Sequence, residues 1–92
     1  MNRDEKLLLV KDSLLNEDSS KAKELFQEIE PADTVEYFMV KGLLEQKFQQ
    51  WGAAINTFQK VLELDPNYVE AQNHIQIIQS ILNFWNPETF NP

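Results

Sequence analysis

The side chains best suited to catalysis or metal binding in this 92-residue chain are one histidine, His74, and 15 carboxylates, since cysteine is absent. A metal site needs several converging ligands, and there is no second histidine or thiolate to join His74. A general-base role would need an orienting partner and a nucleophile, which no strong motif supplies. The two glycines, ten residues apart, do not form a phosphate-binding loop. We therefore expect no enzyme, catalytic residue, cofactor or metal, and a surface or groove position for His74.

The charge balance argues against a nucleic-acid partner. The chain carries 15 acidic and 8 basic side chains, a formal charge of -7, and its cations are scattered from Arg3 to Lys60. A phosphate backbone is repelled by such a surface unless the cations share one face. The lack of cysteine excludes a disulfide-stapled secreted mini-protein. The apolar run from Leu7 to Val10 is too short for a signal peptide or a membrane span, so we expect a soluble, cytoplasmic protein with no membrane partner.

The composition favours an all-α fold, so helices are expected to position these side chains. Glycine is scarce and the prolines lie near element boundaries, which disfavours a hairpin-rich β fold. The apolar periodicity predicts five helices, over residues 3–15, 20–29, 34–48, 52–64 and 68–83. The last nine residues, 84–92, contain two Asn-Pro pairs and are expected to be irregular.

Three kinds of sequence marker recur in the same order. Capping-box patterns occur at three positions, 31 and 34 residues apart: Asn2-x-x-Glu5, Asp33-x-x-Glu36 and Asn67-x-x-Glu70. An alanine and a phenylalanine four residues apart recur at 22/26 and 54/58, and each pair is followed by an acidic residue and a proline, at 30–31 and 65–66. The recurrence indicates two helical hairpins followed by one further helix.

The predicted helices differ in how their apolar residues are spread. The helices over 20–29 and 52–64 each carry one apolar stripe, whereas residues 7–10 and 37–40 are four consecutive apolar residues that cover most of a helix circumference. The second kind is contacted on several sides, so these two helices are expected inside a stack of antiparallel hairpins. The aromatic residues at helical packing positions are predicted to be core: Phe26, Phe38, Trp51 and Phe58.

The segment from 36 to 68 resembles a tetratricopeptide repeat (TPR). The family's motif has a small residue in the first helix, an aromatic near the turn, an alanine and an aromatic in the second helix, and a closing proline. The matching residues here are Gly42, Trp51, Ala54, Phe58 and Pro66. The chain departs from the motif at Glu45 and Val61, where the family usually has an aromatic and an alanine.

The resemblance implies a short right-handed solenoid over residues 1–83. It divides the chain into a degenerate repeat over 2–34, with Val10 in place of the small residue, a clear repeat over 35–67, a capping helix over 68–83, and an aromatic Asn-Pro tail over 84–92.

The resemblance also implies a protein–protein interaction scaffold, because this family usually binds an extended peptide or a helix in its concave groove. Carried over residue by residue, the groove would be lined by Asp4, Leu7, Lys11, Glu36, Met39, Leu43, Gln46, Glu70, Asn73 and Ile77. Met39 and Leu43 stand where the family's carboxylate clamp has polar residues, so that binding mode is not expected. An acidic rim over an apolar floor favours a basic or amphipathic protein segment. The glutamates at helix starts also have a plain structural role, as caps that complement the helix dipole.

The C-terminal quarter carries a second apolar surface. The predicted helix 68–83 has two adjacent apolar stripes, and aromatic residues follow it. One stripe packs on the preceding helix, and the other is covered by the folded-back tail, a second copy of the chain or another protein. The residues of this second interface are Ile77, Ile81, Phe84, Trp85 and Phe90. The alternative function is therefore a self-associating assembly protein whose last helix and tail form a homo-oligomer interface.

Overall fold

The computed structural model describes residues 1–85, and these form helices without a strand. The elements in chain order are α1 (Arg3–Leu15), α2 (Ser19–Gln27), α3 (Val35–Lys47), α4 (Trp51–Leu64) and α5 (Val69–Trp85). The predicted all-α class with five helices is confirmed for this part of the chain. Each predicted helix boundary lies within two residues of the observed one.

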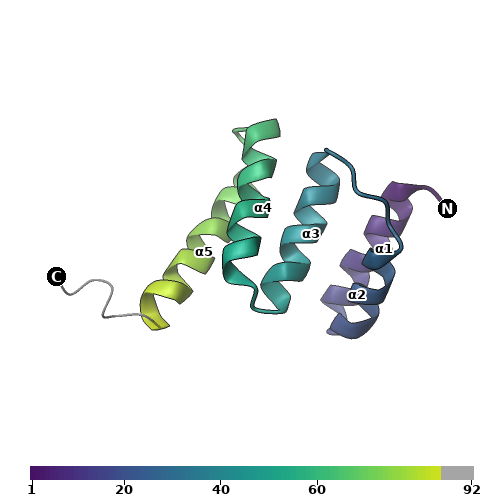
Figure 1. Ribbon diagram of the computed structural model, residues 1–92, viewed down its shortest axis with the longest axis horizontal. Coiled ribbons are helices and arrows are strands. Elements are labelled where there is room, and N and C mark those ends of the chain that lie inside the picture. Colours follow the sequence, from purple (N-terminus) through teal and green to yellow (C-terminus); the bar gives the residue numbers. More distant parts are fainter. Residues whose placement is uncertain (86–92) are drawn as a thin grey trace.

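The helices pack as two hairpins followed by a single helix (Figure 1). α1 packs on α2, α3 packs on α4, and α5 packs mainly on α4, while α3 also contacts both helices of the first hairpin. α1, α3 and α5 run in one direction and α2 and α4 in the other. The amino-terminal ends of α1 and α3 therefore lie toward the same edge of the molecule.

The two hairpins are closed by the same turn. In each, a residue in the left-handed region follows the helix C-cap: Glu17 has φ 59° and Gln49 has φ 60°. The next residue donates its backbone N–H to the carbonyl five positions earlier, at 2.8 Å in the first turn and 2.9 Å in the second. This hydrogen bond defines a Schellman motif. The two turns lie 32 positions apart, so the repeat inferred from the sequence markers is also present in the backbone.

The starts of the helices confirm the first predicted cap and correct the second. The Asn2 side chain accepts a hydrogen bond from the Glu5 N–H at 2.8 Å. α3 is capped by Thr34, whose hydroxyl accepts from the Tyr37 N–H at 3.1 Å. The prediction of Asp33 as the cap is wrong because the helix begins one residue later than the capping-box pattern implied.

The third predicted cap also shifts by one residue. α5 begins at Val69, so Tyr68 is the residue directly before the helix and Asn67 lies one position too early to cap it. The Asn67 N–H donates to Asp65 Oδ1 at 3.2 Å. At its other end α5 continues through residues 84 and 85, which were predicted to be irregular. The reason is that a proline restricts the residue directly before it, and in the Asn-Pro pair at 86–87 that residue is position 86.

Phe58 lies at the centre of the core and joins three helices. Its side chain on α4 is fully buried. On one side it packs against α3 at Gly42, where an added Cβ would lie 2.7 Å from Phe58 Cε1. On the other side the His74 ring of α5 stacks on it, with ring centroids 5.0 Å apart and 9° between the planes. The prediction of Phe58 as core is confirmed, as is that of Phe38, while Phe26 and Trp51 are half-buried.

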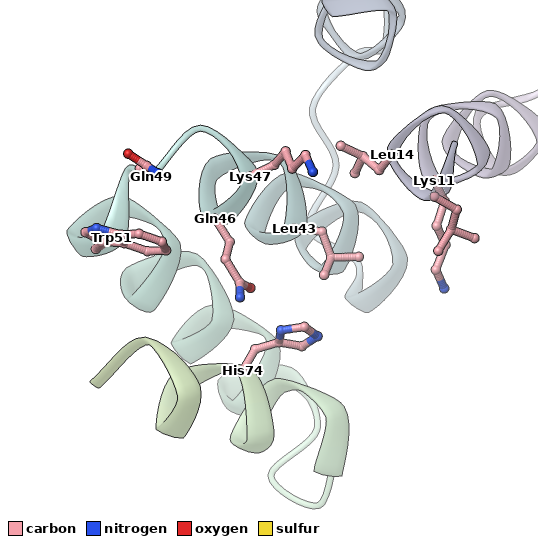
Figure 2. A pocket seen from close by; sticks show the side chains of 9 residues that line it. Lys11, Leu14, Leu43, Gln46, Lys47, Gln49, Trp51 and His74 are labelled. Atoms are coloured by element: carbon pink, nitrogen blue, oxygen red, sulfur yellow. The ribbon is translucent and has the colours of Figure 1, made fainter. Parts of the chain in front are cut away.

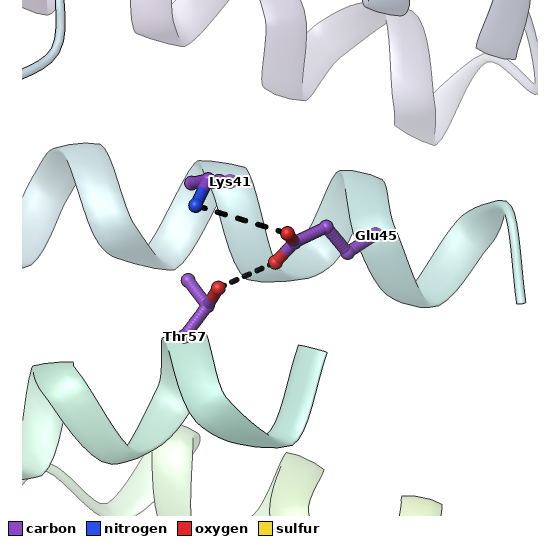
Figure 3. A network of polar contacts seen from close by, with 3 residues as sticks. All are labelled: Lys41, Glu45 and Thr57. Carbon is purple, nitrogen blue, oxygen red and sulfur yellow. Dashed lines mark hydrogen bonds and ion pairs between the residues drawn. The ribbon is translucent and has the colours of Figure 1, made fainter. Parts of the chain in front are cut away.

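Glu45, which stands where the TPR motif has an aromatic, links α3 to α4 through polar contacts (Figure 3). The buried hydroxyl of Thr57 donates to Glu45 Oε1 at 2.5 Å, and Lys41 Nζ lies 3.8 Å from Glu45 Oε2. Burial raises the pKa of Tyr37, and the Glu45 carboxylate raises it further. A hydrogen bond to a carboxylate thus takes the place of the aromatic packing that the resemblance implied at this position.

Candidate functional site

Two adjoining hollows lie between α1 and α3, and we call them together the groove. The first has a volume of about 260 Å³ and is lined by Asp4, Leu7, Leu8, Lys11, Glu36, Met39, Val40 and Tyr68. The second has a volume of about 400 Å³ and is lined by Lys11, Leu14, Leu15, Leu43, Gln46, Lys47, Gln49, Trp51 and His74 (Figure 2). Lys11 lines both hollows, so they adjoin at this side chain along α1 and α3.

The structure brings seven of the ten predicted groove residues to these hollows. They are Asp4, Leu7, Lys11, Glu36, Met39, Leu43 and Gln46. The three predicted residues on α5 line neither hollow: Glu70, Asn73 and Ile77. α5 packs mainly on α4 and reaches the groove through His74, which extends toward α3. His74 therefore has the groove position expected of it.

The apolar surface of the groove differs from the one predicted. Leu7 and Met39 are only 3% and 5% exposed, so they form the buried floor and present little area to a partner. The exposed apolar side chains are instead Leu8, at 61%, and Leu15, at 76%. Sequence reasoning missed both, although their spacing of seven residues places them on one face of α1. That face, with Leu8 and Leu15 at its surface, is the apolar wall of the groove.

Charge in the groove is separated by sign. Asp4 and Glu36 lie in the first turns of α1 and α3, while Lys11 lies two turns further along α1 and Lys47 ends α3. Because α1 and α3 run in the same direction, the groove has an acidic end at Asp4 and Glu36 and a basic end at Lys47, while Lys11 lies between them and lines both hollows. None of these four side chains forms an ion pair within the described part of the chain. All four charges are therefore available to groups outside it.

Tyr68 lies at the acidic end. Burial raises the pKa of its phenol, and the carboxylates of Glu70, Glu36 and Asp65 raise it further. The phenol therefore stays protonated at neutral pH and can donate a hydrogen bond into the first hollow.

Two buried polar atoms face each other across the second hollow. Gln46 reaches from α3 toward α5, and His74 reaches from α5 toward α3 (Figure 2). Gln46 Oε1 and His74 Nδ1 are buried, and neither has a hydrogen-bond partner among the described residues. Buried polar groups are normally hydrogen-bonded, so these two atoms are exceptions among the described residues.

The pH dependence of stability is expected to report on His74. Burial lowers the pKa of His74 below its usual value, and the Glu70 carboxylate opposes this more weakly. The unfolded chain therefore takes up the proton at a higher pH than the folded chain. His74 contributes stability that is complete above about pH 6.5 and is lost as the pH falls toward the folded pKa. Urea unfolding at several pH values should show a steeper loss below about pH 6.5 for the wild type than for His74→Gln.

The His74→Gln variant also loses the ring stacked on Phe58, so its overall stability is expected to be lower at every pH. Only the difference in slope tests the titration, because the carboxylates titrate in both proteins. Parallel curves would contradict a lowered pKa for His74.

No family model matches the chain, and neither does any curated protein or solved structure. Within residues 1–85, no group of three or more His, Cys, Asp or Glu side chains is arranged to hold a metal ion. Of the described helices, none has the length and apolar composition that crossing a bilayer requires.

The predicted second interface is described only in part. On α5, Ile77 is 49% exposed, Ile81 is half-buried and Phe84 is 75% exposed. Val69, which was not predicted, adds a side chain that is 60% exposed. Trp85 closes α5, but its side chain lies outside the described residues, as does Phe90. The folded-back tail, one of the three coverings left open for this stripe, falls on the same undescribed residues.

Proposed function

We propose that this chain is a non-catalytic scaffold of TPR type whose groove binds a segment of another protein. The observation that carries the proposal is the exposure of Leu8 and Leu15 over two adjoining hollows with an apolar floor. Leucines that line a concave surface are a typical sign of a protein-binding site. Fully burying such a side chain contributes about 1.5–3 kcal/mol, so covering both would supply a large share of a binding free energy.

Two structural details support the TPR interpretation. Gly42, which matches the small residue of the motif, allows Phe58 to approach α3 more closely than any side chain would permit. Ala22 and Ala54, the recurring alanines, are both fully buried in the second helices of their hairpins. The packed hairpins form the groove without a ligand, so the groove need not be built when a partner binds.

The proposal is tested by selecting binding peptides from a random library and measuring their affinity for two variants. Leu8→Ser/Leu15→Ser removes the exposed apolar side chains of the groove. Leu64→Ser is the matched control, since Leu64 is 49% exposed at the end of α4 and lines neither hollow. We expect the groove variant to weaken binding by about tenfold or more, because each tenfold corresponds to about 1.4 kcal/mol. The control should leave the affinity within about twofold.

All three substituted leucines are exposed, so both proteins are expected to keep their helical circular dichroism. Peptides that bind the wild type and Leu8→Ser/Leu15→Ser equally well would place the binding surface outside the groove and contradict the proposal.

Self-association through α5 is the alternative function, and the exposure of Val69 and Ile77 favours it. Both lie on the last helix, which packs mainly on α4 and so has a face that a second copy could cover. Sedimentation equilibrium over a wide concentration range separates the alternatives. A strict monomer would rule out the self-associating protein, whereas a dimer that Ile77→Ser dissociates would support it.

A further inference from the structure

The second hollow of the groove differs in charge from the chain as a whole. The full sequence has 15 acidic and 8 basic side chains, and the first hollow has two carboxylates beside one lysine. The described residues that line the second hollow include Lys11 and Lys47 but no Asp or Glu. Neither lysine forms an ion pair within residues 1–85, and only Lys11 also lines the first hollow. Two unpaired ammonium groups beside a surface without carboxylates favour an anionic group.

The walls of this hollow are mostly apolar, with Leu14 and Leu15 from α1, Leu43 from α3 and Trp51 from α4. Leu14, Leu43 and Trp51 pack against the core, which holds them in place, whereas Leu15 is 76% exposed. The volume of about 400 Å³ lies within the range of roughly 300–1,000 Å³ that small-molecule sites occupy, and the volume of the first hollow, about 260 Å³, lies below it. Size and lining together favour a small ligand with an apolar body.

The charged and the apolar side chains surround one opening (Figure 2). Lys47, at the end of α3, reaches toward Leu14 on α1. Leu43 points from α3 into the space between Lys47, Lys11 and His74. Both lysines are exposed, and each carries its ammonium group on a flexible stem. A ligand whose body covers Leu43 therefore has a cation from each of two helices available to its charged end.

The overall charge of the chain limits the anion to a small one. A nucleic acid or an anionic bilayer extends beyond the hollow and meets the carboxylates around it, including Asp4 and Glu36 of the adjoining hollow, in a chain of formal charge -7. The same surroundings repel each added negative charge, so a singly charged carboxylate is favoured over a doubly charged phosphate. Three of the four apolar wall side chains are leucines, which favours an aliphatic body.

We propose that the second hollow binds a free aliphatic carboxylate, whose body covers Leu14, Leu15 and Leu43 and whose carboxylate is held by Lys11 and Lys47. The site goes beyond the proposed function and does not depend on it, because no protein partner takes part. Leu15 belongs to both surfaces, so the small ligand and a bound protein segment compete for the groove.

Three octyl compounds test the proposal, because they share one body and differ only in the charge of the head group. They are octanoate, octanol and octylammonium, and at neutral pH the first is an anion and the last a cation. The chemical shift of the Trp51 indole N–H, followed by NMR in a titration, reports on the hollow. Trp85→Phe leaves Trp51 as the single tryptophan. We expect octanoate to bind about fivefold more tightly than octanol, and octylammonium to bind most weakly.

Paired lysine variants locate the charge that the ligand meets. Lys11→Gln/Lys47→Gln is expected to weaken octanoate by about fivefold, to the affinity of octanol, and to leave octanol within about twofold. Lys21→Gln/Lys60→Gln changes the net charge equally at two exposed lysines that line neither hollow, and should leave octanoate within about twofold. All four lysines are exposed, so both variants are expected to keep their helical circular dichroism.

Several results would overturn the proposal. Octanoate that binds no better than octanol, or not at all up to its solubility, would remove the anion site. Equal losses in the two lysine variants would show that only net charge matters. Shifts on α5 without a shift of the Trp51 indole would place the ligand elsewhere. A leucine-rich peptide with a free terminal carboxylate that binds more tightly than octanoate, through the same lysines, would replace the small ligand with a chain terminus. Phosphatidylglycerol vesicles that pellet the protein through those lysines would replace it with a bilayer.

Discussion

Replacing Phe58 with alanine is expected to lower the free energy of unfolding by about 3–5 kcal/mol. The ring is fully buried between α3 and α5, where Gly42 lies against one side and the His74 ring stacks on the other. Its removal takes away the transfer free energy of the side chain and leaves a cavity that the helices can fill only partly. A single domain has about 5–15 kcal/mol of stability in total, so this loss is a large fraction. Urea denaturation followed by circular dichroism measures it.

Phe48→Ala is the matched control for this prediction. Phe48 caps the end of α3 and is 39% exposed, with Lys23 Nζ lying 5.3 Å from its ring centroid. The same change in chemistry is expected to cost about 1 kcal/mol or less there, because little apolar area leaves a buried site. Equal losses for the two variants would contradict the central position of Phe58.

Gly42→Ala is expected to destabilise the protein by about 1–3 kcal/mol, although alanine is the better helix former. An added Cβ would lie 2.7 Å from Phe58 Cε1 and 2.8 Å from Phe58 Cζ. The His74 ring of α5 stacks on the same phenyl ring, which restricts how far it can move away from α3. The expected loss is therefore a cost of overpacking, which thermal or urea unfolding measures.

The second glycine provides the control for the first. Gly52 lies in the first turn of α4, is exposed, and has no atom within 4 Å of an added Cβ. Gly52→Ala is expected to stabilise the protein by about 0.5–1 kcal/mol through helix propensity alone. In the background of Phe58→Leu, which lacks the clashing Cε1 and Cζ atoms, the cost of Gly42→Ala should shrink. Additive effects of the two substitutions would show that the steric contact is not the cause.

Much of the fold could be predicted because the signals for it are local. The spacing of apolar residues and the cap at Asn2 defined α1 to the residue, from Arg3 to Leu15. The cap of α3 was harder to predict, since Asp33 and Thr34 are both good cap residues. Only the backbone shows that Thr34 holds the cap position. The positive φ values at Glu17 and Gln49 had no signal, because neither residue is a glycine or an asparagine.

The candidate site was harder to predict than the fold. Residues 7–10 are all apolar, so periodicity alone does not say which side of α1 is buried. In the structure Leu7 and Val10 are buried, whereas Leu8 and Leu9 are 61% and 40% exposed. The predicted contribution of α5 depended on how that helix packs. Its position is fixed partly by the stacking of His74 on Phe58, a contact between helices that spacing along the sequence does not reveal.

The helices pack mainly on their neighbours, α1 on α2 and α3 and α5 on α4, and this has a consequence for motion. In arrays of this kind, stability is a sum over neighbouring units, so the terminal helices open at a lower free energy than the central pair. The leucine wall of the groove belongs to α1, a terminal helix, and the floor belongs in part to α3, a central one. Local opening of the first hairpin therefore dismantles the groove without unfolding the rest. A partner bound in the groove, as proposed above, would hold that hairpin closed, so binding and the order of the amino-terminal end would be thermodynamically linked.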